Sequence, residues 1–265
     1  MLFIRRALMT LCFLSAAAAS AKIPDNSFLI EEAYNQEAGV VQFINGYQYS
    51  DLTHDWNYTF TNEIPMGDET HQFSYVLPVS KKTGTPDETG LGDVLLNYRY
   101  QLVNNEHLAM APRLSLIVPT GDYKKGLGNG AVGLQFNQAV SITVNDKWTN
   151  HWNAGFTYIP DGKNANDDKA NLFGFNFGTS AIYELTEKVN LLCEFAYSSM
   201  DSIDSTGMKL NGATYYIVPG VRTSFRATKD TEIVPGIAAL LGAGPSADVH
   251  DRGLFGYLSI ESKLW

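Results

Sequence analysis

The residues most able to do chemistry in this chain are charged side chains on the polar face of segments in which polar and apolar residues alternate. Arginines and carboxylates gathered on one enclosed surface can select permeating solutes by charge. They can also pair with one another, and the ion pairs would then fill and stiffen a narrow interior. The two interpretations are compatible, since a paired rim can still leave a gap. The candidates for a pore lining are Glu63, Asp93, Arg99, Arg113, Glu194, Arg222 and Glu232.

Serine and histidine raise a second possibility, because a hydrolytic enzyme needs both within hydrogen-bonding reach and a third group that orients the histidine. Almost all of the histidines fall at turns or strand ends, and none stands in a local Ser/His pattern. His151 shares a face with Asn153 and is interpreted as a lone polar group. We expect no catalytic residues. An outer-membrane enzyme such as a phospholipase-like hydrolase is the alternative function. The histidines are His54, His71, His107, His151 and His250.

Metal ions and cofactors have little support in the sequence. Asp167, Asp168, Asp201 and Asp204 belong to predicted loops and are expected to face solvent or the cations of lipopolysaccharide. Cys193 is the only cysteine beyond the first 21 residues, which excludes an internal disulfide and a zinc framework in that part of the chain. We therefore predict no cofactor and no metal site.

The scaffold for these side chains is a series of short alternating segments. In KANLFGFNFGTSAIYEL, one parity carries Phe173, Phe175 and Phe177, and the other carries Gly174 and Asn176. A period of two is that of a β-strand with two different faces. Strands of this kind are predicted over residues 38–50, 55–65, 71–81, 91–103, 107–119, 130–144, 147–159, 170–185, 188–199, 212–226, 231–243 and 253–265.

The connections between these strands alternate in length. Short ones, rich in Asn, Asp and Gly, are predicted at 66–70, 104–106, 145–146, 186–187 and 227–230. Longer polar ones are predicted at 82–90, 120–129, 160–169, 200–211 and 244–252. An up-and-down meander with short turns at one end is typical of an outer-membrane barrel, and an even number of strands places both chain ends on the periplasmic side. The connection at 51–54 is short where a long one is expected.

The apolar faces are predicted to contact lipid rather than a protein core. They carry too many Phe, Tyr and Trp residues to fit inside one barrel, while the opposite faces carry small residues such as Gly133, Gly155, Gly178, Gly220 and Gly236. The outward aromatic residues gather near both ends of the strands, with aliphatic residues between them. Two aromatic girdles around an aliphatic belt match the two interfaces of a bilayer.

Backbone pairing leads to two further expectations. A closed barrel leaves no unpaired edge in hydrocarbon, but Pro112, Pro219 and Pro235 each remove a donor within a predicted strand. We expect a local bulge or a missing hydrogen bond at each. The last strand ends at Trp265, and a terminal aromatic residue is expected to be recognised by the barrel assembly machinery, although Trp265 falls on the polar parity.

The first 21 residues have the layout of a secretory signal peptide. Arg5 and Arg6 precede an apolar run, and Ala19, Ser20 and Ala21 form a small-x-small cleavage site. Cleavage near Ala21 would change the net charge from −9 to −11, because the removed segment carries two arginines and no acidic residue. So acidic a chain argues against nucleic acid as a partner.

Residues 22–37 precede the first strand and are predicted to form a periplasmic N-terminal segment, followed by the barrel at 38–265. Asp25 or Ser27 could cap a short helix that runs through Glu31 and Glu32. The segment could enter the barrel mouth as a plug, but docking at the rim is the expected arrangement. Twelve strands lie between filled barrels of about eight and porins of about sixteen to eighteen, so a narrow pore and a plugged structural barrel both stay open.

Several phrases resemble one known family in their order and spacing. They are FLIEEAYNQEAGVVQ at 28–42, GLGDVLLNYRYQL at 90–102, LIVPTGDYKKGLGNG at 116–130 and IVPG at 217–220 and 233–236. The chain resembles the "MetA-pathway of phenol degradation" outer-membrane transporter family over almost its whole length. That resemblance implies a membrane barrel and passage of small organic or aromatic molecules, and it transfers no catalytic residue. Within these phrases, the stretches GLGD at 90–93 and PTGD at 119–122 are interpreted as points where strands re-enter and leave loops.

These observations predict an all-β fold, a transmembrane antiparallel up-and-down β-barrel of about 12 strands, in the bacterial outer membrane. The expected function is a passive channel or transporter for small organic solutes, driven by the solute gradient. The expected partners are outer-membrane lipid and lipopolysaccharide, the solutes, and the assembly machinery through Trp265, with no nucleic acid.

Overall fold

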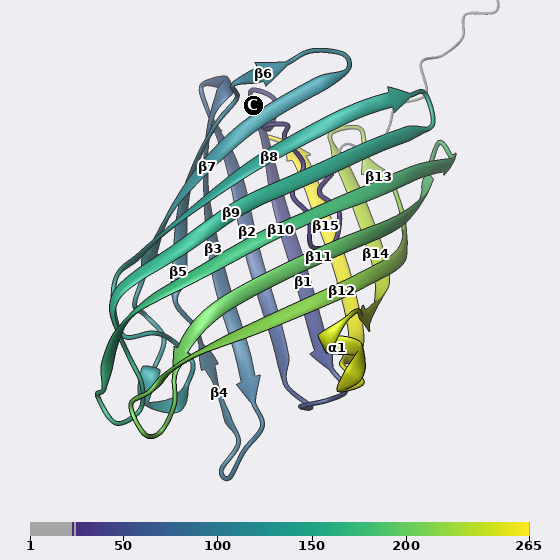
Figure 1. Cartoon of the computed structure of the whole chain (residues 1–265). Coiled ribbons are helices and arrows are strands. Elements are labelled where there is room, and N and C mark those ends of the chain that lie inside the picture. Colours follow the sequence, from purple (N-terminus) through teal and green to yellow (C-terminus); the bar gives the residue numbers. More distant parts are fainter. Residues whose placement is uncertain (1–22, 24, 265) are drawn as a thin grey trace, which may run out of the picture.

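The computed structural model describes residues 23 and 25–264, which form a closed antiparallel β-barrel (Figure 1). Wall strands follow one another around the barrel in chain order. They are β1 (Val40–Ser50), β2 (Trp56–Met66), β3 (Asp68–Lys82), β5 (Val94–Tyr100), β7 (Leu108–Val118), β8 (Gly133–Asn145), β9 (Trp148–Lys163), β10 (Lys169–Thr186), β11 (Val189–Ile203), β12 (Lys209–Thr223), β14 (Thr231–Gly242) and β15 (Arg252–Lys263). The predicted 12-stranded fold is confirmed.

Three short strands extend the wall locally. β4 (Glu88–Leu91) pairs with β3, β6 (Val103–Asn104) pairs with β7, and β13 (Phe225–Thr228) pairs with β14. The helical elements among the described residues are the 3-10 turn η1 (Tyr123–Lys125) and the single turn α1 (Pro245–Asp248). Neither they nor any other described segment forms a helix long and apolar enough to cross a membrane.

Closure joins the first and last strands. β1 pairs with β15 along its whole length, from Val40 opposite Lys263 to Ser50 opposite Gly253. β12 pairs with β14, but this ladder is interrupted between Ile217 and Gly220, where Pro219 lies. A proline lacks the N–H that a ladder needs, so the break there agrees with expectation. The registers through Pro112 and Pro235 contain no shift, so the bulges considered at these prolines are absent.

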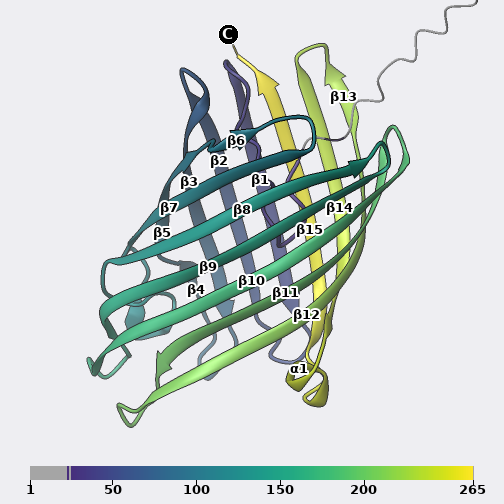
Figure 2. The ribbon, with the colours of Figure 1, turned by 45° about the horizontal axis from the view of Figure 1, so that its top comes forward.

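The two ends of the barrel differ. Figures 1 and 2 place the C-terminal end, β6 and β13 together at one end, which we call the turn end, and α1 and β4 at the other, which we call the loop end. The predicted long loops at 160–169 and 200–211 are wrong. The β9–β12 strands continue through most of these residues, and only 164–168 and 204–208 connect them. Polar composition suggested loops there, but the β11–β12 ladder holds its register to the end.

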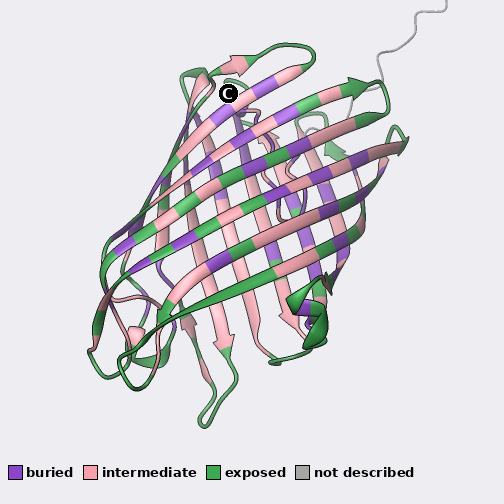
Figure 3. Cartoon of the chain, in the orientation of Figure 1, coloured by how far each residue is buried: buried purple, intermediate pink, exposed green. Residues whose placement is uncertain are grey.

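The two faces of the wall agree with the predicted alternation (Figure 3). On β10, the outward residues Phe173, Phe175 and Phe177 are 37%, 53% and 43% exposed, whereas the inward residues Leu172 and Ser180 are 2% and 0% exposed. The apolar parity therefore faces away from the barrel interior, toward the position of the lipid. The predicted signal peptide at 1–21, Lys22 and Trp265 lie outside the described residues.

The chain ahead of β1 runs inside the barrel, where the N-terminal trace is visible among the strands in Figure 1. Residues 25–37, which we call the luminal segment, form bends rather than the helix considered for Asp25 to Glu32. A helix would need its backbone N–H groups for carbonyls four residues back. Here several of those N–H groups donate to side chains of the wall instead, which explains why no helix forms.

Candidate functional site

The luminal segment is fastened to the inner wall by side chains that accept its backbone N–H groups. Because the acceptors come from successive parts of the wall, from β11 round to β3, the segment follows the inner circumference before it enters β1. Six of its backbone donors obtain a partner in this way. The bonds run from Phe28 and Leu29 to Glu194 (2.6 and 2.9 Å), from Glu31 to Asn153 (2.8 Å), from Ala33 to Ser141 (2.8 Å), from Asn35 to Gln101 (2.8 Å) and from Gln36 to Gln72 (2.7 Å).

Two arginines hold the carbonyl groups of the same segment. Arg222 on β12 donates to the carbonyl oxygens of Ile23 (3.3 Å) and Asp25 (2.9 Å), and also to that of Asn26. Arg99 on β5 donates to the carbonyl oxygens of Glu32 (3.3 Å) and Tyr34 (2.5 Å) and to the side-chain oxygen of Asn35 (2.8 Å). Guanidinium donors in a fixed fork suit adjacent carbonyls. Both ends of the segment are therefore clamped by buried cations.

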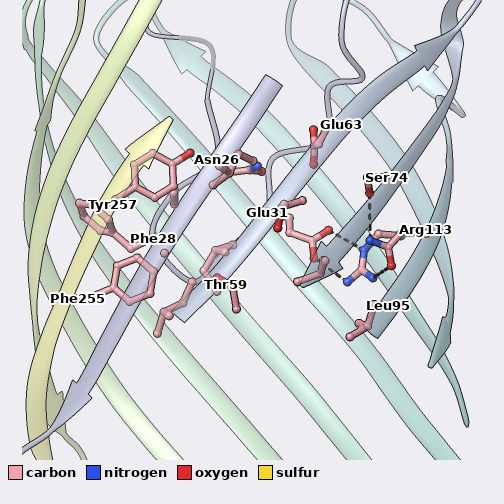
Figure 4. Close-up of a pocket in the computed structure, with 18 residues that line it drawn as sticks. Asn26, Phe28, Glu31, Thr59, Glu63, Ser74, Leu95, Arg113, Phe255 and Tyr257 are labelled. Carbon is pink, nitrogen blue, oxygen red and sulfur yellow. Dashed lines mark hydrogen bonds and ion pairs between the residues drawn. The ribbon is translucent and has the colours of Figure 1, made fainter. Parts of the chain in front are cut away.

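A third arginine forms an ion pair with the segment. Arg113 on β7 donates from Nε and Nη2 to the two carboxylate oxygens of Glu31, at 3.0 and 2.6 Å (Figure 4). Paired parallel bonds of this kind are stronger than single neutral ones. The same guanidinium also donates to Asn97 and Gln135. The Arg113–Glu31 pair thus fixes the middle of the luminal segment against β7.

The predicted pore-lining residues divide into three groups. Arg99, Arg113, Glu194 and Arg222 contact the luminal segment directly. Glu63 lies behind Arg99, with 3.5 Å between its Oε2 and the Arg99 Nη2. Among the described ion pairs, only this one joins two of the predicted residues, because the other arginines bind the segment instead. Asp93 and Glu232 lie elsewhere.

Asp93 fastens a connection at the loop end. Its carboxylate accepts the backbone N–H groups of Gly121 (3.0 Å) and Asn129 (2.7 Å), so it ties the β7–β8 connection to the start of β5. Glu232 lies on β14 opposite Glu261, near the turn end.

Glycines on the inner wall make room for apolar side chains of the segment. The Phe28 ring covers Gly220 and Gly236, and a Cβ atom at Gly236 would lie 2.8 Å from the ring. The Ile30 side chain covers Gly178 in the same way. Gly220 and Gly236 end the two IVPG phrases, which the sequence analysis placed within strands. The structure agrees, since both glycines lie within β12 and β14, where they accommodate Phe28.

Cavities lie on both sides of the luminal segment. On the loop side, one cavity of about 260 Å³ is lined by Phe28, Glu31 and Arg113, as Figure 4 shows. A second of about 320 Å³ lies on the same side against β9–β12. On the turn side, a cavity of about 230 Å³ is lined by Glu32 and Arg222 among others. The segment thus separates the loop-side cavities from the turn-side cavity.

Two acids of the segment, Glu32 and Asp25, have a raised pKa. Burial raises the pKa of Glu32 to about 8; the neighbouring Asp25 acts in the same direction, and Arg99 and Arg222 oppose it. Burial also raises the pKa of Asp25 to about 6, against the effects of Arg222 and of the hydrogen bond from Tyr257. The segment is therefore docked with Glu32 mostly protonated at neutral pH.

One serine–histidine contact was missed by the sequence analysis. Ser141 and His151 are directly opposite on β8 and β9, with 2.7 Å between Oγ and Nδ1. The statement that no histidine belongs to a Ser/His pattern is therefore wrong, because the two lie ten residues apart and meet only through strand pairing. Ser141 is nevertheless 0% exposed and its Oγ accepts the N–H of Ala33. A covered serine of this kind is poorly placed to attack a substrate.

Neutral polar residues are the contacts that sequence reasoning did not single out. The inward parity of the strands was the available signal, but it gives no partner for such side chains. The residues are Gln72, Gln101, Ser141, Asn153 and Ser180. Among the described residues no group of three or more His, Cys, Asp or Glu side chains is arranged to hold a metal ion.

The chain is similar to solved outer-membrane proteins. An outer membrane channel of the COG4313 group from Pseudomonas putida F1 superposes with a TM-score of 0.62 at 12% identity, covering 87% of this chain and 97% of that one. The NanC porin gives a TM-score of 0.52 at 8% identity, covering 84% and 100%. At these identities the likeness establishes the fold.

Comparison of the sequence itself gives a more specific result. No curated protein matches the chain. A family model described as "Putative MetA-pathway of phenol degradation" matches residues 19–241, and the chain therefore belongs to this family.

Proposed function

We propose that the protein is a passive outer-membrane channel for small organic solutes, including aromatic ones, and that the luminal segment controls its lumen. The observation that carries this proposal is the position of the segment, which lies between cavities of about 260 and 320 Å³ on one side and about 230 Å³ on the other. Short turns of such barrels face the periplasm. The loop-side cavities are then the entrance, and the turn-side cavity is the exit.

The entrance has two kinds of surface. Phe28, Ile44 and Phe255 supply apolar walls, while Glu31 and Arg113 supply a charged side. An organic molecule with one polar end can therefore enter without losing all of its hydrogen bonds. The membership of the family supports organic solutes as the cargo. Movement follows the solute gradient, since no nucleotide-binding pattern occurs in the sequence.

Passage requires the luminal segment to shift. Its fastenings are separate hydrogen bonds to individual side chains, each worth about 0.5–1.5 kcal/mol net, or more where a charged group takes part. One part of the luminal segment can therefore detach from the wall while the other parts stay bound. Solute that displaces a few of these bonds would open a path between the entrance and the exit.

A reversible crosslink tests this role. The Oγ atoms of Ser27 on the segment and Ser180 on β10 are 2.8 Å apart, which favours a disulfide in a Ser27→Cys/Ser180→Cys variant that also carries Cys193→Ser. We expect single-channel conductance in planar bilayers to fall when the pair is oxidised and to recover on reduction. The matched control is Ser27→Cys with Cys193→Ser. It cannot form the disulfide, so its conductance should be the same under oxidising and reducing conditions.

The outcomes separate the two parts of the proposal. Equal conductance in both redox states, with the disulfide confirmed by mass, would show that the segment does not control the lumen. Absence of conductance and of aromatic-solute uptake into liposomes under all conditions would refute the channel. Lipid hydrolysis abolished by Ser141→Ala would instead establish the hydrolase alternative.

A further inference from the structure

The turn-side cavity has walls suited to a small ring. Ile23, Tyr34 and Ile182 line it with apolar surface, and its volume is about 230 Å³. An engineered apolar cavity of about 150 Å³ already binds benzene. The turn-side cavity can therefore hold a six-membered ring that carries a substituent.

Two facing residues of the cavity lining each carry a buried polar atom that has no hydrogen-bond partner among the described residues. The atoms are Oδ1 of Asn190 and Nε of Arg222, and the two residues are 4% and 2% exposed. Both line the cavity and are directly opposite on β11 and β12. One is an acceptor and the other a donor. Leaving such groups unpaired costs free energy, so a ligand that satisfies both gains affinity.

The hydrogen-bonding groups of the cavity favour an uncharged ligand. Two acids, Glu32 and Glu184, and two bases, Lys147 and Arg222, line it, together with His151. Groups of both signs are present, so charge alone does not select the ligand. A hydroxyl group can donate to Asn190 and accept from Arg222 at the same time, whereas a carboxylate cannot donate and a hydrocarbon can do neither.

We propose that the turn-side cavity is a binding site for a small uncharged cyclic alcohol, with the ring against Ile182 and the hydroxyl between Asn190 and Arg222. This inference rests on the proposed function, because it makes the cavity the last binding site of a solute before it leaves the channel. It adds a chemical preference, for a hydroxyl over a charged group or a bare hydrocarbon, at the exit.

The test is a binding measurement on the full barrel in lipid nanodiscs, with cyclohexanol as the probe and ligand-observed NMR as the readout. We expect saturable binding that is about tenfold weaker in Asn190→Leu, which loses a hydrogen bond. Methylcyclohexane and cyclohexanecarboxylate should bind the original protein at least tenfold more weakly than cyclohexanol. The matched control is Asn137→Leu on β8, a buried asparagine that lines none of the three cavities described above, which should leave cyclohexanol binding unchanged.

Three results would show that the turn-side cavity is not a binding site for a cyclic alcohol. Unsaturable uptake equal to that of empty nanodiscs, equal binding by Asn190→Leu, or equal binding of methylcyclohexane would overturn the inference. If Asn190→Leu fails to assemble, Ile182→Phe fills the same cavity and should abolish binding. Conductance is recorded on the same preparations. Conducting barrels without the site would refute only this inference, and binding without conductance would refute only the channel.

Discussion

The two faces of β10 show how differently the barrel uses its outer and inner surfaces. The outward residues Phe173, Phe175 and Phe177 repeat one chemistry at every second position. The inward residues do not repeat: Gly178 accommodates Ile30, and Ser180 accepts a hydrogen bond from Ser27. Outside, the expected environment is uniform hydrocarbon, so any large apolar side chain serves. Inside, each of these residues contacts one particular partner that lies far away in the sequence.

The largest effect is expected when a charge is placed on the outer face, because this removes the difference between the two faces. Phe175→Arg places a guanidinium on the lipid side near the middle of β10, at a cost of about 2–4 kcal/mol near the bilayer midplane. We expect failed membrane assembly or a matching loss of unfolding free energy, measured by urea titration in lipid vesicles. Asn176→Arg, the next residue, points inward to a loop-side cavity and should cost clearly less. Equal losses at the two positions would remove the distinction between the faces.

The second effect concerns the inner face. Glu194→Ala removes the acceptor of the Phe28 and Leu29 N–H groups, and orphaned buried donors cost roughly 1–3 kcal/mol. We expect faster amide hydrogen exchange across residues 25–37 and longer open times, with assembly in the membrane unchanged. Glu232→Ala makes the same charge change on β14 and is the matched control. If Glu232→Ala loosened the segment equally, the effect would be one of net charge and not of a specific contact.

The third effect tests the fit between Phe28 and its glycines. In Gly236→Ala, the added Cβ would lie 2.8 Å from the Phe28 ring and 3.1 Å from the Arg222 Cβ. Overpacking of this kind costs about 1–3 kcal/mol. We expect the segment to loosen and Phe28→Ala to restore part of the docking in the double variant. Gly236 is chosen because its Cβ would lie 3.3 Å from the nearest wall backbone atom, the Val221 oxygen, whereas a Cβ at Gly220 would lie 2.8 Å from the Ile237 oxygen. Strictly additive effects of the two substitutions would contradict the contact.

The comparison of faces also explains how far the sequence could be interpreted. The strand count, the closure and the outward direction of Phe175 follow from a period of two and from one uniform surrounding. The charged inward residues, such as Arg99 and Glu194, could be selected by parity, but parity does not say what they bind. Their partners are peptide groups of the luminal segment, which carry no side-chain signature. Ser141 and His151 were missed for a related reason, since only strand register brings them together.

The smallest expected effect, for a change of one pH unit, is the pH dependence of the docked luminal segment. The pKa of Glu32 is about 8 in the docked segment, against an ordinary value of 4.5 for a glutamate that is free in water. Docking therefore binds a proton, so the docked state loses stability as the pH rises from 4.5 to about 8 and changes little above that. One proton shifts the equilibrium by at most about 1.4 kcal/mol per pH unit.

Asp25 acts in the same direction, but only up to a pH of about 6, so a titration between pH 6.5 and 8 lies above the range of Asp25. Over that range we expect the open fraction in planar bilayers to rise with pH. Glu32→Gln keeps the side chain neutral at every pH and should flatten this rise. An unchanged slope in Glu32→Gln would mean that the proton is taken up elsewhere. The inner face would then be sensitive to pH through the wall and not through the segment that the wall holds.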